Sequence, residues 1–96
     1  LLDEAGMETY ERVVQLPFWD DYFDEMKSKI ADLNNLGGGM AGMITAGKFL
    51  EHFVKAPYIH MDIAGPAYLE KPQDYRGLGG TGTGIRLLIN FLKRLA

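Results

Sequence analysis

The sequence predicts an α/β fold in which helices alternate with short strands. Apolar residues recur at helical spacing in residues 43–54 and 84–95, and β-rich runs occupy residues 11–16 and 58–63. With the ambiguous segment 29–35, the chain has at most three candidate strands. A sheet that small, apolar on both faces, needs further strands beside it. The 96 residues are therefore expected to be a truncated part of a larger sheet.

The first elements along the chain are expected to be a helix end, a strand and a second helix. Residues 1–9 predict the end of a helix with no capping residue before it, so the natural start is expected to lie upstream. The short β-rich run 11–16 ends at Pro17. Residues 18–28 then predict a helix whose apolar face is expected to be core packing, because four large residues recur at helical spacing: Trp19, Tyr22, Phe23 and Met26.

The middle of the chain is predicted to hold a glycine-rich loop followed by a helix. Residues 29–35 have too few apolar positions to fix a period. The glycine-rich loop covers residues 36–42, and the helix predicted over residues 43–54 cannot continue past Pro57.

The last third is predicted to hold a strand, a polar loop and the closing helix. The strand is expected at residues 58–63 and the loop at residues 68–80. The helix is expected over residues 84–95, with Thr83 as its N-cap.

Composition excludes several classes of function. The net charge is -3 and no basic block is present, so binding to the phosphate backbone of nucleic acid is not expected. The uninterrupted apolar runs are only a few residues long, whereas a membrane-spanning helix needs about 20. Cysteine is absent, so disulfides and thiolate metal sites are excluded.

The glycine-rich loop permits a dinucleotide-type binding site. Gly37, Gly39 and Gly42 satisfy the spacing G-x-G-x-x-G before a predicted helix, and Asp62 follows 20 residues after Gly42. The residues before the loop, however, are polar for a buried parallel strand. The other interpretation is that these glycines allow a tight turn and close packing. A non-enzymatic binding module that uses residues 37–42 is the alternative function.

The titratable residues do not make a complete catalytic centre. His52 and His60 are the two histidines, and neither has the spacing of a histidine metal site. His60 and Asp62 share one face of the predicted strand, where they are expected to form a structural hydrogen-bonded pair rather than to bind a metal. Ser28 is the single serine and has no nucleophile context.

Five stretches, in order, resemble motifs of the leucyl (cytosol) aminopeptidase family. Residues 12–17 (R-V-V-Q-L-P) resemble its R-V-W-x-L-P segment, and residues 29–38 its x-x-A-D-x-x-N-x-G stretch. Residues 42–50 (G-M-I-T-A-G-K-F-L) match a helix motif, and residues 80–86 (G-T-G-T-G-I-R) match the closing motif. The most specific match is residues 60–65 (H-M-D-I-A-G), where the family has H-L-D-I-A-G.

The resemblance implies a fold and an activity. Residues 1–96 would be the C-terminal part of the catalytic domain, a truncated mixed β-sheet flanked by helices in three αβα layers. The full-length enzyme would be a cytoplasmic homo-hexamer that removes N-terminal, leucine-like residues from peptides. Two divalent metal ions, zinc or manganese, would hold and activate the attacking water. No nucleic-acid or membrane partner is implied.

The resemblance also limits which functional residues this chain can hold. The family's metal ligands lie mainly in an N-T-D-A-E-G-R motif and in a segment before it, and neither occurs in this sequence. No catalytic or metal-binding residue is therefore expected here, and the chain alone is expected to be inactive. Ala64 and Ala67 match positions that line the pocket for the substrate's N-terminal side chain, and Leu36 matches a position in the next pocket.

Overall fold

The computed structural model describes residues 1–39 and 41–96, which form two compact units. The terminal unit consists of Leu1–Gln15 and Ile63–Ala96, and the middle unit is Leu16–Asp62. The terminal unit contains helices α1, α3 and α4 and strands β1 and β2, and the middle unit contains the 3₁₀ helix η1 and helix α2.

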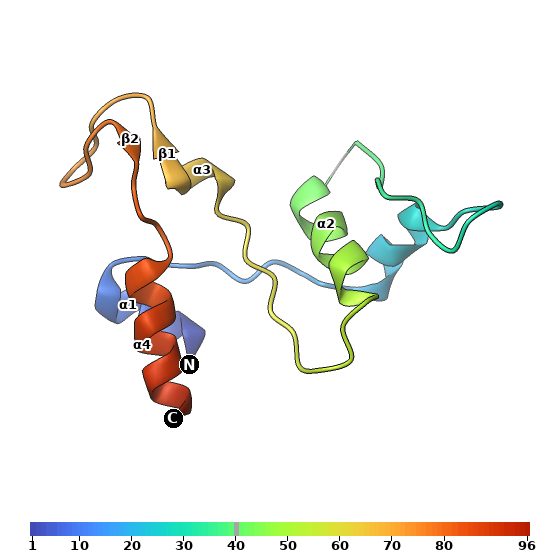
Figure 1. The fold of residues 1–96 in the computed structure, drawn as a ribbon, viewed down its shortest axis with the longest axis horizontal. Helices are drawn as coiled ribbons and strands as arrows, with labels where there is room; N and C mark the ends of the chain where they lie inside the picture. The colour runs from blue at the N-terminus through green and yellow to red at the C-terminus, as the bar shows by residue number, and fades with distance from the viewer. Residues whose placement is uncertain (40) are drawn as a thin grey trace. The chain divides into compact units, whose positions relative to one another are not determined.

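Two helices from opposite ends of the sequence pack together in the terminal unit. Helix α1 spans Leu2–Thr9 and helix α4 spans Ile85–Leu95 (Figure 1). Ala5 is fully buried and Leu87 is 2% exposed, so apolar burial provides the contact. Both helices were predicted from the sequence, and both are confirmed.

Helix α1 ends in a left-handed turn. Tyr10, its C-cap, has φ 57° and ψ 31°, and its backbone N–H donates to the Gly6 carbonyl. This conformation closes many helices, usually with glycine because a Cβ is disfavoured there. Gly6 is buried where the chain turns back, and a Cβ on it would lie 2.9 Å from the Glu11 carbonyl oxygen. The glycine therefore permits the close approach of the next segment.

The strands are not where the sequence predicted them. Residues 11–16 and 58–63 form no strand among the described residues. Their β-branched content favours extended backbone, but a strand also requires a neighbour with which to exchange hydrogen bonds, and the described part of the chain provides none there.

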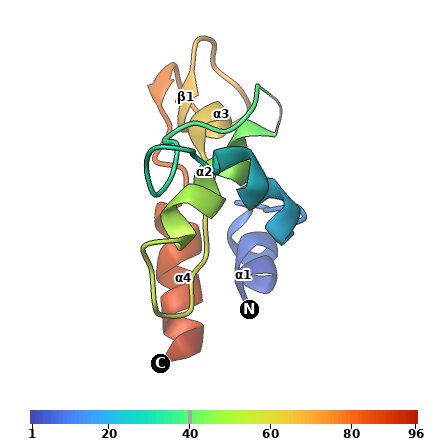
Figure 2. The same ribbon diagram turned by 90° about the vertical axis from the view of Figure 1, so that its right-hand side faces the viewer.

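A small hairpin lies instead in the segment predicted as a loop. Strand β1 (Tyr68–Leu69) pairs antiparallel with β2 (Gly79–Gly80), and Tyr68 lies opposite Gly80. Helix α3 (Ala64–Ala67) leads directly into β1 (Figure 2). The combination of helices with a two-stranded sheet is consistent with the predicted α/β class.

The middle unit is built from two helical segments that pack together. Helix η1 is a 3₁₀ helix over Asp20–Met26, and α2 is an α-helix over Gly42–Glu51. Met26 is 1% exposed and Ile44 is 8% exposed. The helix predicted over residues 18–28 is thus shorter and tighter than expected, since three aspartates in seven residues are poor α-helix formers.

The aromatic stripe of that segment is only partly core. Met26 is buried and Phe23 is half-buried, whereas Trp19 is 64% exposed and stacks on Tyr22 with ring centroids 6.2 Å apart. The prediction of core packing is therefore wrong for Trp19.

Many large apolar side chains of the described residues are exposed to solvent. On α4 alone Ile85, Ile89 and Leu92 are each more than half exposed. Such a row of exposed apolar residues on an amphipathic helix is typical of a face that another part of a protein covers. No helix in the described ranges has the length and apolar character required to cross a membrane.

Candidate functional site

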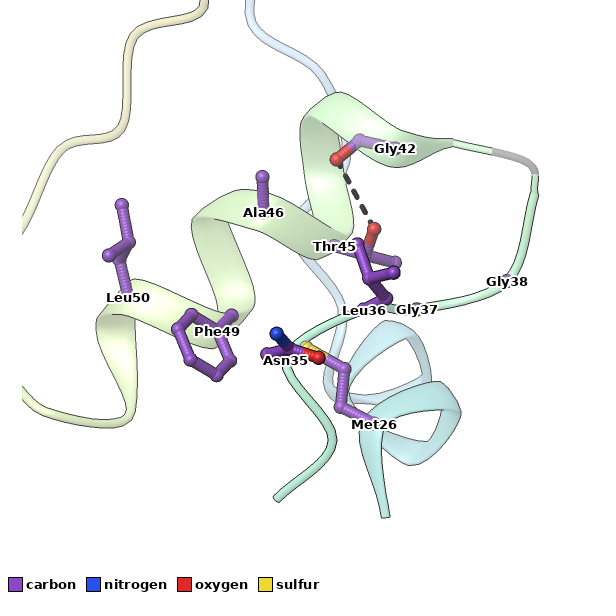
Figure 3. A pocket seen from close by; sticks show the side chains of 10 residues that line it. All are labelled: Met26, Asn35, Leu36, Gly37, Gly38, Gly42, Thr45, Ala46, Phe49 and Leu50. Atoms are coloured by element: carbon purple, nitrogen blue, oxygen red, sulfur yellow. Dashed lines mark hydrogen bonds between the residues drawn. The ribbon is translucent and has the colours of Figure 1, made fainter. Parts of the chain in front are cut away.

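A cavity of ≈ 350 Å³ in the middle unit is lined by Leu36, one of the three residues expected to line a substrate pocket. Figure 3 shows its walls, which come from η1, the glycine-rich loop and α2. Leu36 is 76% exposed and Leu50 is 47% exposed, so both belong to the open side of the cavity, whereas Met26 is buried. The full lining is Met26, Asn35, Leu36, Gly37, Gly38, Gly42, Thr45, Ala46, Phe49 and Leu50.

The glycine-rich loop is held on both sides. A Cβ on Gly37 would lie 2.9 Å from the Thr45 Cβ, so only glycine fits against α2 at this point. The Thr45 hydroxyl donates to the Gly42 carbonyl at 3.2 Å, the bond drawn in Figure 3. On the other side, the Gly38 N–H donates to Glu25 Oε2 at 2.8 Å. The loop is thereby fixed between η1 and α2.

This arrangement does not favour a dinucleotide site. In such a site the loop amides bind phosphate after a buried strand. Here the Gly38 amide binds the Glu25 carboxylate, whose negative charge would repel a phosphate, and residues 29–39 contain no strand. Met40, inside the same loop, lies outside the described residues. The close-packing interpretation of the motif is supported at Gly37, whereas a Cβ on Gly39 or Gly42 would have no described atom within 4 Å.

Lys48 is a buried cation that the sequence did not reveal. Its side chain is 4% exposed, and its Nζ lies 3.2 Å from Glu51 Oε1 and 3.4 Å from Asp20 Oδ1. The Nζ also lies 4.1 Å from the centre of the Phe18 ring. Two carboxylates and an aromatic face compensate the buried charge, so Lys48 joins η1 to α2. The spacing to Glu51 was the available sequence signal, but it could not identify Asp20 or Phe18.

Both histidines contribute to packing in the middle unit. The His52 ring stacks on Phe23 at 5.6 Å between centroids. His60 Nδ1 lies 3.3 Å from the Tyr58 hydroxyl, and its ring covers Gly47, where a Cβ would lie 2.9 Å from Cγ of His60. Within residues 1–39 and 41–96, no three His, Asp or Glu side chains come together in a way that could hold a metal ion.

Ala64 and Ala67, the other two expected pocket residues, lie at the two ends of α3 in the terminal unit. Ala64 is exposed and Ala67 is half-buried. The Thr81 backbone N–H donates to the Ala67 carbonyl at 2.9 Å, and the Thr81 hydroxyl donates to the Pro66 carbonyl at 2.6 Å. Leu36 belongs to the middle unit.

Thr83 does not cap the last helix, contrary to the sequence prediction. The N-cap of α4 is Gly84, with φ 94°, and no side-chain bond from the cap residue is present. The Thr83 hydroxyl instead lies 3.0 Å from the Pro66 carbonyl and 2.8 Å from the Thr81 hydroxyl. The left-handed Gly84 places Thr83 one position too early to bond the first helical amides.

A distant carboxylate caps α4 instead. Glu11 Oε2 accepts the backbone N–H groups of Gly84 at 3.2 Å and Leu87 at 2.9 Å. Glu11 Oε1 lies 3.5 Å from the Arg86 guanidinium, which also donates to the Tyr75 hydroxyl. That hydrogen bond, with the weaker attraction of Glu11, raises the pKa of Arg86 above its ordinary value. No local sequence pattern could have paired residues this far apart.

Comparison with known proteins identifies the relatives of this chain. Residues 1–89 match the cytosol aminopeptidase family, catalytic domain. A probable cytosol aminopeptidase of Geobacter sulfurreducens is 52% identical over 94 residues, which cover 97% of this chain and 19% of the relative. One from Clostridium perfringens is 51% identical over 94 residues, again 97% of this chain and 19% of the relative.

A solved structure agrees with the sequence comparison. The crystal structure of cytosol aminopeptidase from Coxiella burnetii superposes with a TM-score of 0.86 at 34% sequence identity. The match covers 97% of this chain and 21% of that chain. The chain thus spans about a fifth of the length of the proteins it matches. The match over residues 1–89 shows that this chain belongs to the cytosol aminopeptidase family.

Proposed function

We propose that this chain is the C-terminal part of the catalytic domain of a two-metal leucyl aminopeptidase, which removes N-terminal residues from peptides. The observation that carries the proposal is the family match over residues 1–89, together with about 50% identity to cytosol aminopeptidases over 94 residues. The five sequence motifs occur in family order, which supports the same assignment.

The chain contributes a wall of the substrate pocket rather than the reacting groups. Ala64 and Ala67 contact the N-terminal side chain of the peptide, and Leu36 contacts the next side chain. The small Ala67 leaves room for a bulky N-terminal residue, since a single methylene changes discrimination by about 1–3 kcal/mol. The exposed position of Leu36 on a cavity of ≈ 350 Å³ supports its role.

The metal centre belongs to the part of the full-length protein outside these 96 residues. Two divalent ions, zinc or manganese, bind there and supply the activated water. The exposed apolar face of α4 supports the presence of further protein around this chain, which completes a mixed sheet between two helical layers. The full-length protein is a cytoplasmic homo-hexamer.

The proposal is tested by assaying the full-length protein that contains this sequence. With leucine p-nitroanilide and manganese, we expect steady release of p-nitroaniline that a chelator abolishes and manganese restores. Full-length protein with bound manganese and no turnover of any N-terminal residue would contradict the proposal.

A further inference from the structure

Helix α3 cannot hold its own conformation. It is a single turn of four residues, Ala64–Ala67, and the backbone bond that closes it runs from the Ala67 N–H to the Ile63 carbonyl at 3.0 Å. One isolated turn is unfavourable, because several dihedral angles are fixed for one hydrogen bond. The position of Ala64 and Ala67 must therefore be set by contacts from outside the turn.

Those contacts come from the segment between β2 and α4. The Thr81 N–H donates to the Ala67 carbonyl at 2.9 Å, and the Thr81 hydroxyl donates to the Pro66 carbonyl at 2.6 Å. Both carbonyls lie at the C-terminal end of α3, where helix carbonyls lack partners within the helix. One residue thus satisfies two successive carbonyls of α3.

The distances around Pro66 indicate which threonine is the main donor to its carbonyl. Thr81 and Thr83 have one hydroxyl proton each. The bond from Thr81 to the Pro66 carbonyl, at 2.6 Å, is the shortest, and the Thr83 hydroxyl lies 3.0 Å from the same carbonyl and 2.8 Å from Thr81 Oγ1. Because its distance to the Pro66 carbonyl is the shorter of the two, the Thr81 hydroxyl is the main side-chain donor to that carbonyl, and the Thr83 hydroxyl is the second. The Thr83 N–H also donates to Thr81 Oγ1, at 3.3 Å, which orients that hydroxyl.

The threonine segment is itself fixed at both ends. On one side Gly80 pairs with Tyr68 in the hairpin, and on the other Gly84 begins α4, where its N–H donates to Glu11. Gly82, with φ 69°, supplies the left-handed turn between the two threonines. Thr81 therefore connects α3, a single turn that is unstable alone, to a segment held in place by the hairpin and by α4.

We propose that Thr81 is a positioning residue that sets substrate specificity by fixing α3, which carries the pocket alanines. This inference rests on the proposed function. Without the Thr81 hydroxyl, α3 moves more freely, so Ala64 and Ala67 no longer hold a well-defined wall against a leucine side chain. Discrimination between large and small N-terminal residues then falls, while the chemistry at the metals is unaffected.

The test compares substrates in the full-length protein. The readout is the ratio of kcat/KM for leucine p-nitroanilide to kcat/KM for alanine p-nitroanilide, with the manganese content measured beside it. This ratio does not depend on the fraction of folded enzyme. In Thr81→Val, which keeps the shape and removes the hydroxyl, we expect the ratio to fall by about 3- to 10-fold, mainly through a higher KM for the leucine substrate.

Two further variants separate positioning from a general structural role. Thr81→Ser keeps the hydroxyl and is expected to restore the ratio to within about two-fold of the wild type. Thr9→Val is the matched control, because the Thr9 hydroxyl donates to Ala5 of its own helix at 2.7 Å, and its ratio is expected to be unchanged. If Thr81→Val yields no soluble protein, Thr83→Val carries the same test with an expected fall of about 2- to 3-fold.

The outcomes distinguish this inference from the function on which it rests. An active wild type whose ratio is the same in Thr81→Val, or in Thr83→Val where that variant replaces it, would overturn the inference alone. Equal falls in Thr81→Val and Thr9→Val would overturn it too, because they would show a nonspecific effect. A wild type that turns over neither substrate would overturn the proposed function and the inference with it.

Discussion

The Glu11 carboxylate accepts the backbone N–H of Leu87 at 2.9 Å, although 76 positions separate the two residues in sequence. The same carboxylate oxygen accepts the N–H of Gly84 at 3.2 Å. A helix begins with N–H groups that have no partner inside the helix, and a carboxylate there also interacts favourably with the helix dipole. The segment that follows α1 thus stabilises the start of α4.

Glu11→Gln is expected to loosen the first turn of α4. Hydrogen bonds to a charged group contribute about 1.5–3 kcal/mol, and the Glu11 side chain is 11% exposed, so solvent screens it little. Hydrogen exchange of the amides of Gly84 and Leu87 should become faster, as measured by NMR or mass spectrometry. Glu8→Gln is the control. Glu8 pairs with Arg94 but is 61% exposed, so hydrogen exchange of the Gly84 and Leu87 amides should change little in this variant. If these two amides exchanged at equal rates in Glu11→Gln and Glu8→Gln, the result would contradict the role of Glu11 as the cap of α4.

The left-handed Tyr10 predicts a difference between two small substitutions. Its φ of 57° disfavours any residue with a Cβ, and its side chain is 57% exposed. Tyr10→Gly and Tyr10→Ala both remove the ring, but only glycine removes the strain. We expect Tyr10→Gly to be more stable than Tyr10→Ala by about 1 kcal/mol, measured by urea unfolding of the full-length protein. A glycine variant less stable than the alanine variant would contradict the assigned conformation.

The buried Lys48 is expected to matter more for its carbon chain than for its charge. Its partner Asp20 is fully exposed and Glu51 is 42% exposed, so the ion pairs contribute little. Lys48→Met should therefore stay within about 1 kcal/mol of the wild type, whereas Lys48→Ala should lose about 2 kcal/mol because it leaves a cavity. Urea unfolding of both variants measures this, and equal losses would show that the charge dominates.

Ala67→Met tests the size of the proposed substrate pocket. A methionine on α3 would fill the space that the N-terminal side chain is proposed to occupy. In the full-length protein, we expect the preference for leucine over alanine p-nitroanilide to fall by about 10-fold or more. Met43→Leu, on an exposed position of α2, is the control and should leave the preference unchanged. An unaltered preference in Ala67→Met would exclude the residue from the pocket.

The sequence predicted the helices better than the strands, for a physical reason. The periods of α2 and α4 are properties of their own residues, so local pattern was enough. A strand depends on a neighbour, and residues 11–16 have none among the described residues. Tyr68 instead pairs with Gly80, in a segment whose composition is mostly polar and glycine-rich.

The three proposed pocket residues came from the family motifs and not from any local pattern, and their contact with substrate stays a prediction. The motifs named Leu36, which lies on a cavity, and Ala64 and Ala67, which share α3. The contacts of Glu11, Lys48 and Thr81 were not predictable, since each joins residues far apart in the sequence. Such pairings depend on tertiary packing and leave no periodic signal in a single sequence.

We propose that these residues form the wall of a peptide-trimming pocket whose metal ions bind elsewhere in the full-length protein. The most direct measurement is a crystal structure of that protein with manganese and a non-hydrolysable leucine dipeptide analogue. We expect the leucine side chain to lie within about 4.5 Å of Ala64 and Ala67, with every metal ligand outside the 96 residues. A leucine side chain bound away from both alanines, or a metal ion coordinated by His52, His60 or Asp62, would contradict the proposed pocket.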